Sequence, residues 1–202
     1  GLPGLPTVSV RGDLFVDVTS TGIGSSYATY WPGFGYRPLA AGELLSSLTN
    51  MASTGVNLAP NGSQAFGTAT VNTLTLGAGA GVAGYGAGSI LTTSNYGILA
   101  LPGNTGVGSG QISTAGLTMM LYTAGSLTVS GYLVNTANGF NKAGPGTLTL
   151  NAPSFTIGTQ TVNGGIFQMN ANADNTLVVN PTATALSPQA LTVNAGSVDL
   201  NG

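Results

Sequence analysis

The chain has 202 residues, of which three are basic and five acidic, so charged residues make up only 4% of it. An ordinary soluble domain carries about 25%. Histidine and cysteine are both absent, which removes the imidazole base, the thiol nucleophile and the usual zinc and iron–sulfur ligands. Three scattered basic residues also cannot neutralise a run of phosphates. We therefore expect no catalysis, no metal or other cofactor, and no nucleic-acid partner.

Apolar runs in the chain are short, because glycine, threonine and asparagine interrupt them. None approaches the stretch of about 18 apolar residues that a membrane-spanning helix needs, so we expect a chain that is not transmembrane. Residues Gly1 to Pro6 hold neither an initiator methionine nor a basic segment followed by an apolar one. This start is typical of a processed or excised chain.

Residues 1–63 form an irregular region that we expect to cap the rest of the fold or to carry an interaction. Thr7 to Val10 and Leu14 to Thr19 are typical of strands. Between them lies Arg11-Gly12-Asp13, a tripeptide that some integrin-binding proteins display. Three residues match by chance often, and an apolar run follows this match. We interpret it as a turn or the start of a strand.

Aromatic residues are concentrated at Tyr30, Trp31, Phe34 and Tyr36. Exposed rings of this kind stack on sugars, which makes the four residues candidates for contact with a glycan. Aromatic rings also dominate the packing of cores and interfaces. The sequence favours the second role, in which these rings cap an open end of the fold or pack a helix against it.

One helix is predicted, over residues Pro38 to Met51. Its apolar residues recur at spacings of mainly three and four, Pro38 suits an early helical position, and Gly55 follows the segment. The apolar residues are Leu39, Leu44, Leu45, Leu48 and Met51.

Residues 64–202 are a succession of short strands in which apolar residues alternate with small polar ones, each ended by glycine, asparagine or proline. The predicted strands are Val71–Leu76, Ser89–Leu91, Ile98–Leu101, Leu117–Leu121, Ser126–Val129, Tyr132–Val134, Thr147–Leu150, Phe155–Ile157, Ile166–Met169, Thr176–Val179, Leu191–Val193 and Ser197–Leu200.

Part of this region repeats itself. Thr161 to Asn170 matches Thr192 to Asn201 at an offset of 31 residues, and Thr147 to Asn151 matches Thr176 to Asn180 at an offset of 29. Two strands and a corner thus recur in the same order. A coil of such strands buries one side of each strand in a continuous core. We predict an all-β parallel β-helix, or β-solenoid, over a sandwich, which favours longer strands and more regular turns.

A known family carries a similar pattern. Residues Gly139 to Asn151, with Lys142 between glycines and a following Thr-Leu-Thr-Leu strand, resemble the autotransporter-associated β-strand repeat of bacterial surface proteins. Residues Thr159 to Asn170 resemble the segment that follows in this repeat, although Pro145 and the connection after Asn151 depart from its pattern. The resemblance implies a right-handed parallel β-helix exported to the bacterial cell surface, and implies nothing about catalysis.

Some parallel β-helices cleave polysaccharides, which requires two neighbouring carboxyl groups. Asp13 and Asp17 would lie about 13 Å apart along one strand, at about 3.3 Å per residue. Asp174 and Asp199 fall at non-equivalent positions of different repeats. The sequence therefore keeps a polysaccharide-cleaving enzyme only as a remote alternative.

Assembly is the function that the sequence favours. A fold of stacked strands with almost no charged residues has little to prevent its open strand edges from pairing with another chain. The sequence ends on a strand of the repeat. We expect an extracellular structural protein whose copies associate end to end in a surface fibre. A monomeric adhesin that binds a glycan or receptor is the alternative. Candidates for the assembly edges are Leu2, Leu5, Val8, Val10, Val198 and Leu200.

Overall fold

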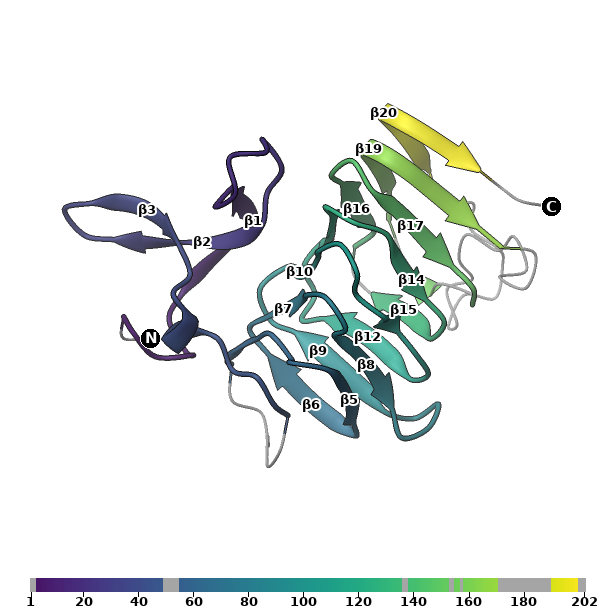
Figure 1. Cartoon of the computed structure of the whole chain (residues 1–202). Helices are drawn as coiled ribbons and strands as arrows, with labels where there is room; N and C mark the ends of the chain where they lie inside the picture. The colour runs from purple at the N-terminus through teal and green to yellow at the C-terminus, as the bar shows by residue number, and fades with distance from the viewer. Residues whose placement is uncertain are drawn as a thin grey trace.

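A computed structural model describes residues 3–48, 55–135, 138–152, 155–156, 158–170 and 190–199. Its first part is a three-stranded antiparallel sheet of β1 (Val10–Val16), β2 (Ser26–Trp31) and β3 (Gly35–Pro38), in that order. The second part is a stack of parallel strands that begins at β4 (Asn57–Leu58). Figure 1 shows the first sheet beside one end of the stack, with the β2–β3 hairpin directed away from it.

The stack is a β-solenoid of about five rungs, where one rung is a complete circuit of three strands. Its strands form three faces, and each face is a parallel ladder. The first face contains β5 (Ser63–Phe66), β8 (Gly81–Gly84), β11 (Gly106–Val107), β14 (Leu127–Val129) and β17 (Thr147–Leu150). The second contains β6 (Thr68–Val71), β9 (Ile90–Thr93), β12 (Gln111–Thr114), β15 (Tyr132–Asn135) and β18 (Phe155–Thr156). The third contains β4, β7 (Thr73–Leu76), β10 (Gly97–Ala100), β13 (Met119–Thr123) and β16 (Phe140–Ala143).

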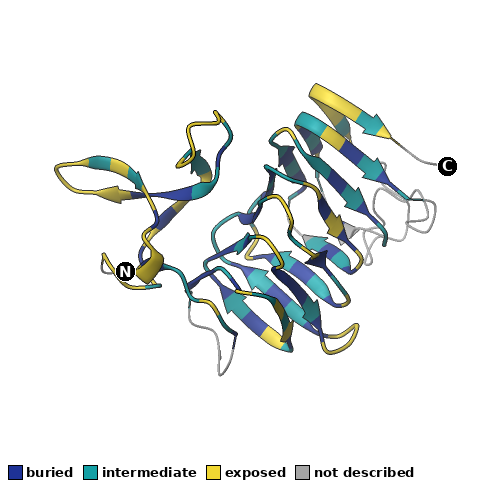
Figure 2. Cartoon of the chain, in the orientation of Figure 1, coloured by how far each residue is buried: buried dark blue, intermediate teal, exposed yellow. Residues whose placement is uncertain are grey.

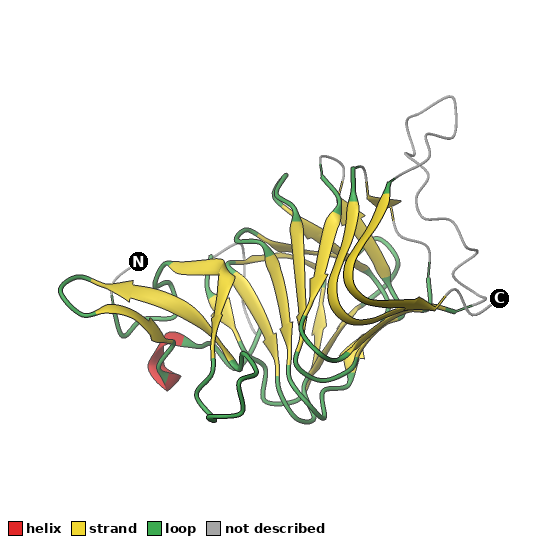
Figure 3. Cartoon of the chain, turned by 90° about the horizontal axis from the view of Figure 1, so that it is seen from above, coloured by secondary structure: helices red, strands yellow, loops and turns green. Residues whose placement is uncertain are grey.

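Two longer strands complete the stack. β19 (Gln160–Met169) and β20 (Leu191–Asp199) each continue from the third face round a corner to the first, as their curvature in Figure 3 shows. The parallel ladders confirm the prediction of a β-solenoid and exclude a sandwich.

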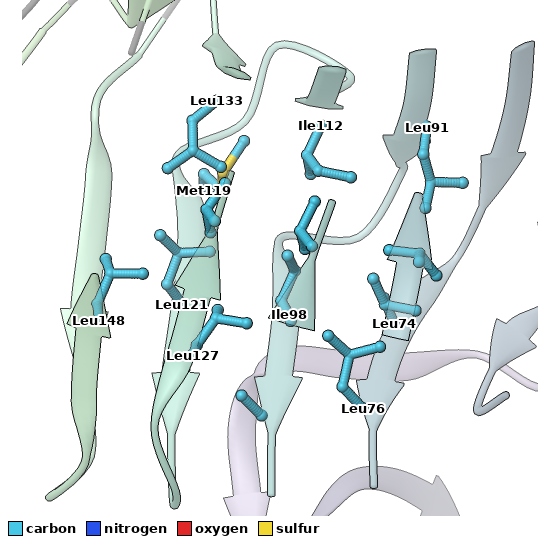
Figure 4. Close-up of a cluster of buried hydrophobic side chains, with 14 of the residues drawn as sticks. Leu74, Leu76, Leu91, Ile98, Ile112, Met119, Leu121, Leu127, Leu133 and Leu148 are labelled. Carbon is cyan, nitrogen blue, oxygen red and sulfur yellow. The ribbon is translucent and has the colours of Figure 1, made fainter. Parts of the chain in front are cut away.

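The core is narrow because each short strand contributes one or two inward side chains. On the third face, Leu58, Leu74, Ile98 and Leu121 pair in register on successive rungs, and all four are fully buried. Figure 4 shows Leu74, Ile98 and Leu121 of this row beside inward side chains of the other faces. Figure 2 shows buried and more accessible residues alternating along the strands. The alternation follows from the two-residue period of a strand.

The repeat found in the sequence corresponds to one rung. Thr161 pairs with Thr192 and Val162 pairs with Val193, so β20 lies in register on β19 at the offset of the repeat. In the second match, residues 147–150 form β17, and residues 176–180 lie outside the described residues.

The antiparallel sheet is attached to the solenoid through a second apolar cluster. Val8, Val10, Tyr27 and Leu39 are buried together with Leu99 of β10. The Tyr27 hydroxyl donates a hydrogen bond of 3.0 Å to the carbonyl of Gly97. These contacts hold the sheet against the third face.

The predicted helix over Pro38 to Met51 is wrong. Pro38 ends β3, Ala41–Glu43 form a single 3-10 turn, and Leu44 is already extended. Leu45 then pairs with Leu58 in the manner of a strand. The leucine spacing does not come from one face of a helix. Leu39 is buried in the second cluster, whereas Leu48 is buried in the solenoid core. Met51 lies outside the described residues.

Candidate interaction surfaces

The aromatic residues singled out from the sequence lie on the β2–β3 hairpin, and all four are exposed. Phe34, in the tight turn between the strands, is 85% exposed, and Trp31 at the end of β2 is 42% exposed. The Phe34 N–H donates to the Trp31 carbonyl at 3.0 Å, which closes the turn. The prediction that these rings cap the solenoid or pack a helix against it is therefore wrong, because they face solvent and the helix is absent.

The rings pack against one another instead. Tyr30 and Tyr36 are paired directly across the hairpin, with ring centroids 5.4 Å apart in an edge-to-face arrangement. Trp31 and Phe34 form a second edge-to-face pair at 6.0 Å, and the Arg37 guanidinium lies 4.8 Å from the centre of the Trp31 ring. Such pairs stabilise a defined ring arrangement. The hairpin thus presents a structured aromatic surface.

A buried carboxylate fixes the base of the hairpin. Glu43 is fully buried and accepts two hydrogen bonds from Arg37, at 2.7 and 2.6 Å, and one each from the N–H groups of Gly4 and Ala40. The hydrogen bonds from Arg37 lower the pKa of Glu43 to about 2, and those from the backbone act in the same direction. The pair also neutralises Arg37, so the aromatic surface carries no uncompensated charge.

The predicted assembly-edge residues fall in different places. Val8 and Val10 are buried in this chain's own second cluster, so they are engaged within the molecule. Leu5 is exposed, and Val198 in β20 is partly buried against the core. Leu2 and Leu200 lie outside the described residues.

β20 is covered on one side only, as far as the described residues show, because it pairs with β19 alone. Val162 in β19 is fully buried, whereas Val193, its in-register partner in β20, is 47% exposed. Asparagine side chains run along the corner: Asn163 donates to Asn141 at 2.6 Å, and Asn194 donates to Asn163 at 2.7 Å. β20 therefore has the side-chain pattern of a rung but lacks the burial of one.

The lysine of the quoted motif has a structural role that sequence reasoning did not assign. Lys142 occupies the inward row of the third face, paired with Leu121 and Val162, and is fully buried. Its ammonium group donates to the carbonyls of Gly144, Gly146 and Gly164 at 2.8, 2.6 and 2.6 Å. Burial lowers the pKa of Lys142 to about 8. A lone lysine at an inward position of an alternating strand was the signal in the sequence.

Two open pockets lie between the first part of the chain and the corners of the solenoid. One, of about 360 Å³, extends from Ser26 to Asn61 and Thr75. The other, of about 320 Å³, is almost entirely apolar, and it is lined chiefly by Thr19, Thr21, Ile23, Leu101, Pro102 and Ala124. Neither has a charged residue in its lining. No sequence signal could have identified them, because their walls come from segments far apart in the chain.

The carboxylates in the described part of the chain are engaged by donor groups. Asp13 pairs with Arg11 at 2.7 Å within β1, so the Arg11-Gly12-Asp13 tripeptide lies in a strand. A Cβ on Gly12 would collide with the Asn95 carbonyl. Asp17 accepts from Thr19 and Gly22, and Asp199 accepts from Gln168.

Within the described residues, no three carboxylate side chains lie close enough together to hold a metal ion. In the same residues, no helix is long and apolar enough to cross a bilayer.

Comparison with known proteins adds no relative: no family model, curated protein or solved structure matches the chain. The structure itself shows a parallel β-solenoid with an antiparallel sheet at one end.

Proposed function

We propose that the protein is an extracellular structural β-solenoid whose copies associate through β20. The observation that carries the proposal is the incomplete burial of this strand. Val193 and Val198 occupy the positions that Val162 and Phe167 fill in β19, yet only the β19 residues are fully buried. Placing a second copy against β20 would complete the core there and would pair the N–H and C=O groups of the strand.

The opposite end of the solenoid is built differently. Leu45 pairs with Leu58 outside the first rung, and the carbonyl of Pro6 accepts a hydrogen bond of 2.7 Å from the Asn57 N–H. Leu48 and Val56 are buried in the core at this end. Because the two ends differ, the matching surface for β20 is β20 of a second copy. Two equivalent edges meet in a symmetric contact.

Location outside a bacterial cell belongs to the same proposal. It rests on the resemblance of residues 139–170 to the autotransporter-associated repeat, and labelling of intact cells by an antibody against the protein tests it. The fold supports the comparison only at the level of a β-solenoid.

Substitution of Val193 tests the association. Sedimentation velocity and electron microscopy of the 202-residue chain should show assemblies larger than one copy. Val193→Lys places a charge on the inward side of β20 and should remove the β20 contact. Thr192→Lys adds the same charge at an outward, exposed position of the same strand and is the matched control.

Two results would overturn the proposal. One is a parent chain that sediments as a single 19.8 kDa species at every concentration. The other is a Thr192→Lys variant that loses association as completely as the Val193→Lys variant does.

A monomeric parent chain that bound an oligosaccharide array through Trp31 would establish the adhesin hypothesis instead.

A further inference from the structure

We propose that Phe34 of one copy inserts into the apolar pocket formed by Ile23, Leu101, Pro102 and Ala124 of another. This inference rests on the proposed self-association, to which it adds a second contact. A β20 contact between equivalent edges closes on itself and yields pairs. A contact between two different surfaces leaves one of each surface free on every copy, so it propagates into a fibre.

Phe34 has the features of an interface anchor. It is the most exposed large apolar residue in the described part of the chain, at 85%. The Trp31 ring supports it at 6.0 Å, and the Arg37–Glu43 pair fixes the strand behind it. Burial of a fully exposed aromatic ring is strongly favourable in water. Interface hot spots are typically aromatic side chains that fill a pocket on the partner.

The pocket fits such a ring in size and polarity. A cavity of about 150 Å³ lined by aliphatic side chains is sufficient to bind benzene, and the pocket measures about 320 Å³. Its walls are the hydroxyl-bearing and apolar residues of the loop after β1, together with Leu101, Pro102 and Ala124 on the solenoid corners. No lining residue is charged, so a phenyl ring would enter without desolvating an ion.

The two surfaces cannot meet within one molecule. The hairpin that carries Phe34 points away from the solenoid in both Figure 1 and Figure 3. The pocket lies against the solenoid corners, between the loop that contains Ile23 and the chain at Leu101. The ring of one copy is therefore available to the pocket of the next.

Charge does not oppose the contact. The whole chain carries a formal net charge of −2, and the basic residue beside the aromatic surface is already paired with Glu43. Long-range repulsion between copies is correspondingly weak.

The test separates this contact from the one at β20. In the Val193→Lys background, the chain should still associate weakly as its concentration rises. Phe34→Ala removes the anchor and should weaken this association about 30-fold, which corresponds to about 2 kcal/mol. Ala124→Phe fills the pocket and should act equally. Tyr85→Ala removes a ring that is 81% exposed on another corner and is the matched control.

Mixing gives the sharpest result, with Val193→Lys present in both copies to remove the β20 contact. The Phe34→Ala copy keeps its pocket and the Ala124→Phe copy keeps its ring. Each alone should therefore be monomeric at a concentration at which the mixture forms one-to-one dimers. Ile23→Asp serves as a second pocket variant if Ala124→Phe does not fold, which thermal unfolding of each variant reveals.

Three outcomes would overturn the inference. These are a Val193→Lys chain that remains monomeric up to millimolar concentration, a mixture that forms no dimer, and binding of an oligosaccharide that Phe34→Ala abolishes without any change in association. None of them would overturn the association through β20, which the parent chain tests separately.

Discussion

Raising the pH from 8 to 9.5 is expected to stabilise the folded chain. The only lysine, Lys142, is fully buried in the row of inward side chains between Leu121 and Val162. Burial lowers its pKa from 10.5 to about 8. Between these values the folded chain has released the proton while the unfolded chain still binds it. Stability rises with pH wherever the unfolded state binds more protons.

The size of the effect follows from the pH interval over which the unfolded chain binds a proton that the folded chain has released. One pKa unit corresponds to about 1.36 kcal/mol. Because the folded lysine is still half protonated at pH 8, the free energy of unfolding should increase by about 1.6 kcal/mol between pH 8 and 9.5. The measurement stops at pH 9.5 because a second group acts in the opposite direction above it. Burial raises the pKa of Tyr27 well above 10, so at higher pH this tyrosine ionises only in the unfolded chain, which lowers the stability of the folded one.

Urea unfolding of the parent and of Lys142→Met at a series of pH values measures the effect. Methionine keeps an unbranched side chain in the row but cannot titrate, so its stability should be almost independent of pH between 8 and 9.5. Equal slopes for the two proteins would show that Lys142 is not the group responsible. A flat parent curve would show that the carbonyls of Gly144, Gly146 and Gly164 compensate the ammonium fully for its lost hydration.

Three further changes test other parts of the fold. Glu43→Gln should lower the free energy of unfolding by about 2–3 kcal/mol at pH 7, because Arg37 loses a charged acceptor. In the parent this contribution is present above pH 4.5 and is lost as the pH falls toward 2, so urea midpoints of parent and variant should converge at low pH. Gly165→Ala should cost more than about 2 kcal/mol, because φ is +64° and the new Cβ would overlap the Gly146 carbonyl and the Lys142 ammonium. Gly77→Ala, which meets no atom within 4 Å, should change stability by less than 1 kcal/mol. Leu121→Ala should cost about 2–5 kcal/mol, measured against the exposed Thr128→Ala on the neighbouring face.

The solenoid could be predicted because its information is local and repeated. Alternation within each short strand identifies the inward residues, and the match between residues 161–170 and 192–201 anticipates that β20 lies in register on β19. A parallel stack places like segments on one another, so a repeat in the sequence becomes a neighbour in space.

The helix over Pro38 to Met51 illustrates the limit of such patterns. A spacing of three and four residues also occurs in an extended segment whose leucines are buried in separate apolar clusters. Leu39 and Leu48 enter separate clusters, and Leu45 pairs as part of a sheet. A short helix is marginal by itself, and contacts made by distant parts of the chain decide against it here.

The candidate surfaces were predictable in part. The aromatic residues of the hairpin are visible as a cluster in the sequence, but their exposure depends on where β2 and β3 project. Lys142 could be identified as unusual, whereas its three carbonyl partners come from the corner segments of two successive rungs, which only the stacking of the rungs brings together.

The sequence by itself determined that this protein builds a continuous, mainly apolar core from short strands in a parallel β-solenoid, because residue alternation and repetition are properties of the chain. Only the tertiary structure decided that Phe34 faces solvent, that an apolar pocket lies beside Leu101, and that β20 is less buried than β19. Exposure and cavities arise between segments that are distant in the chain, so no local pattern encodes them.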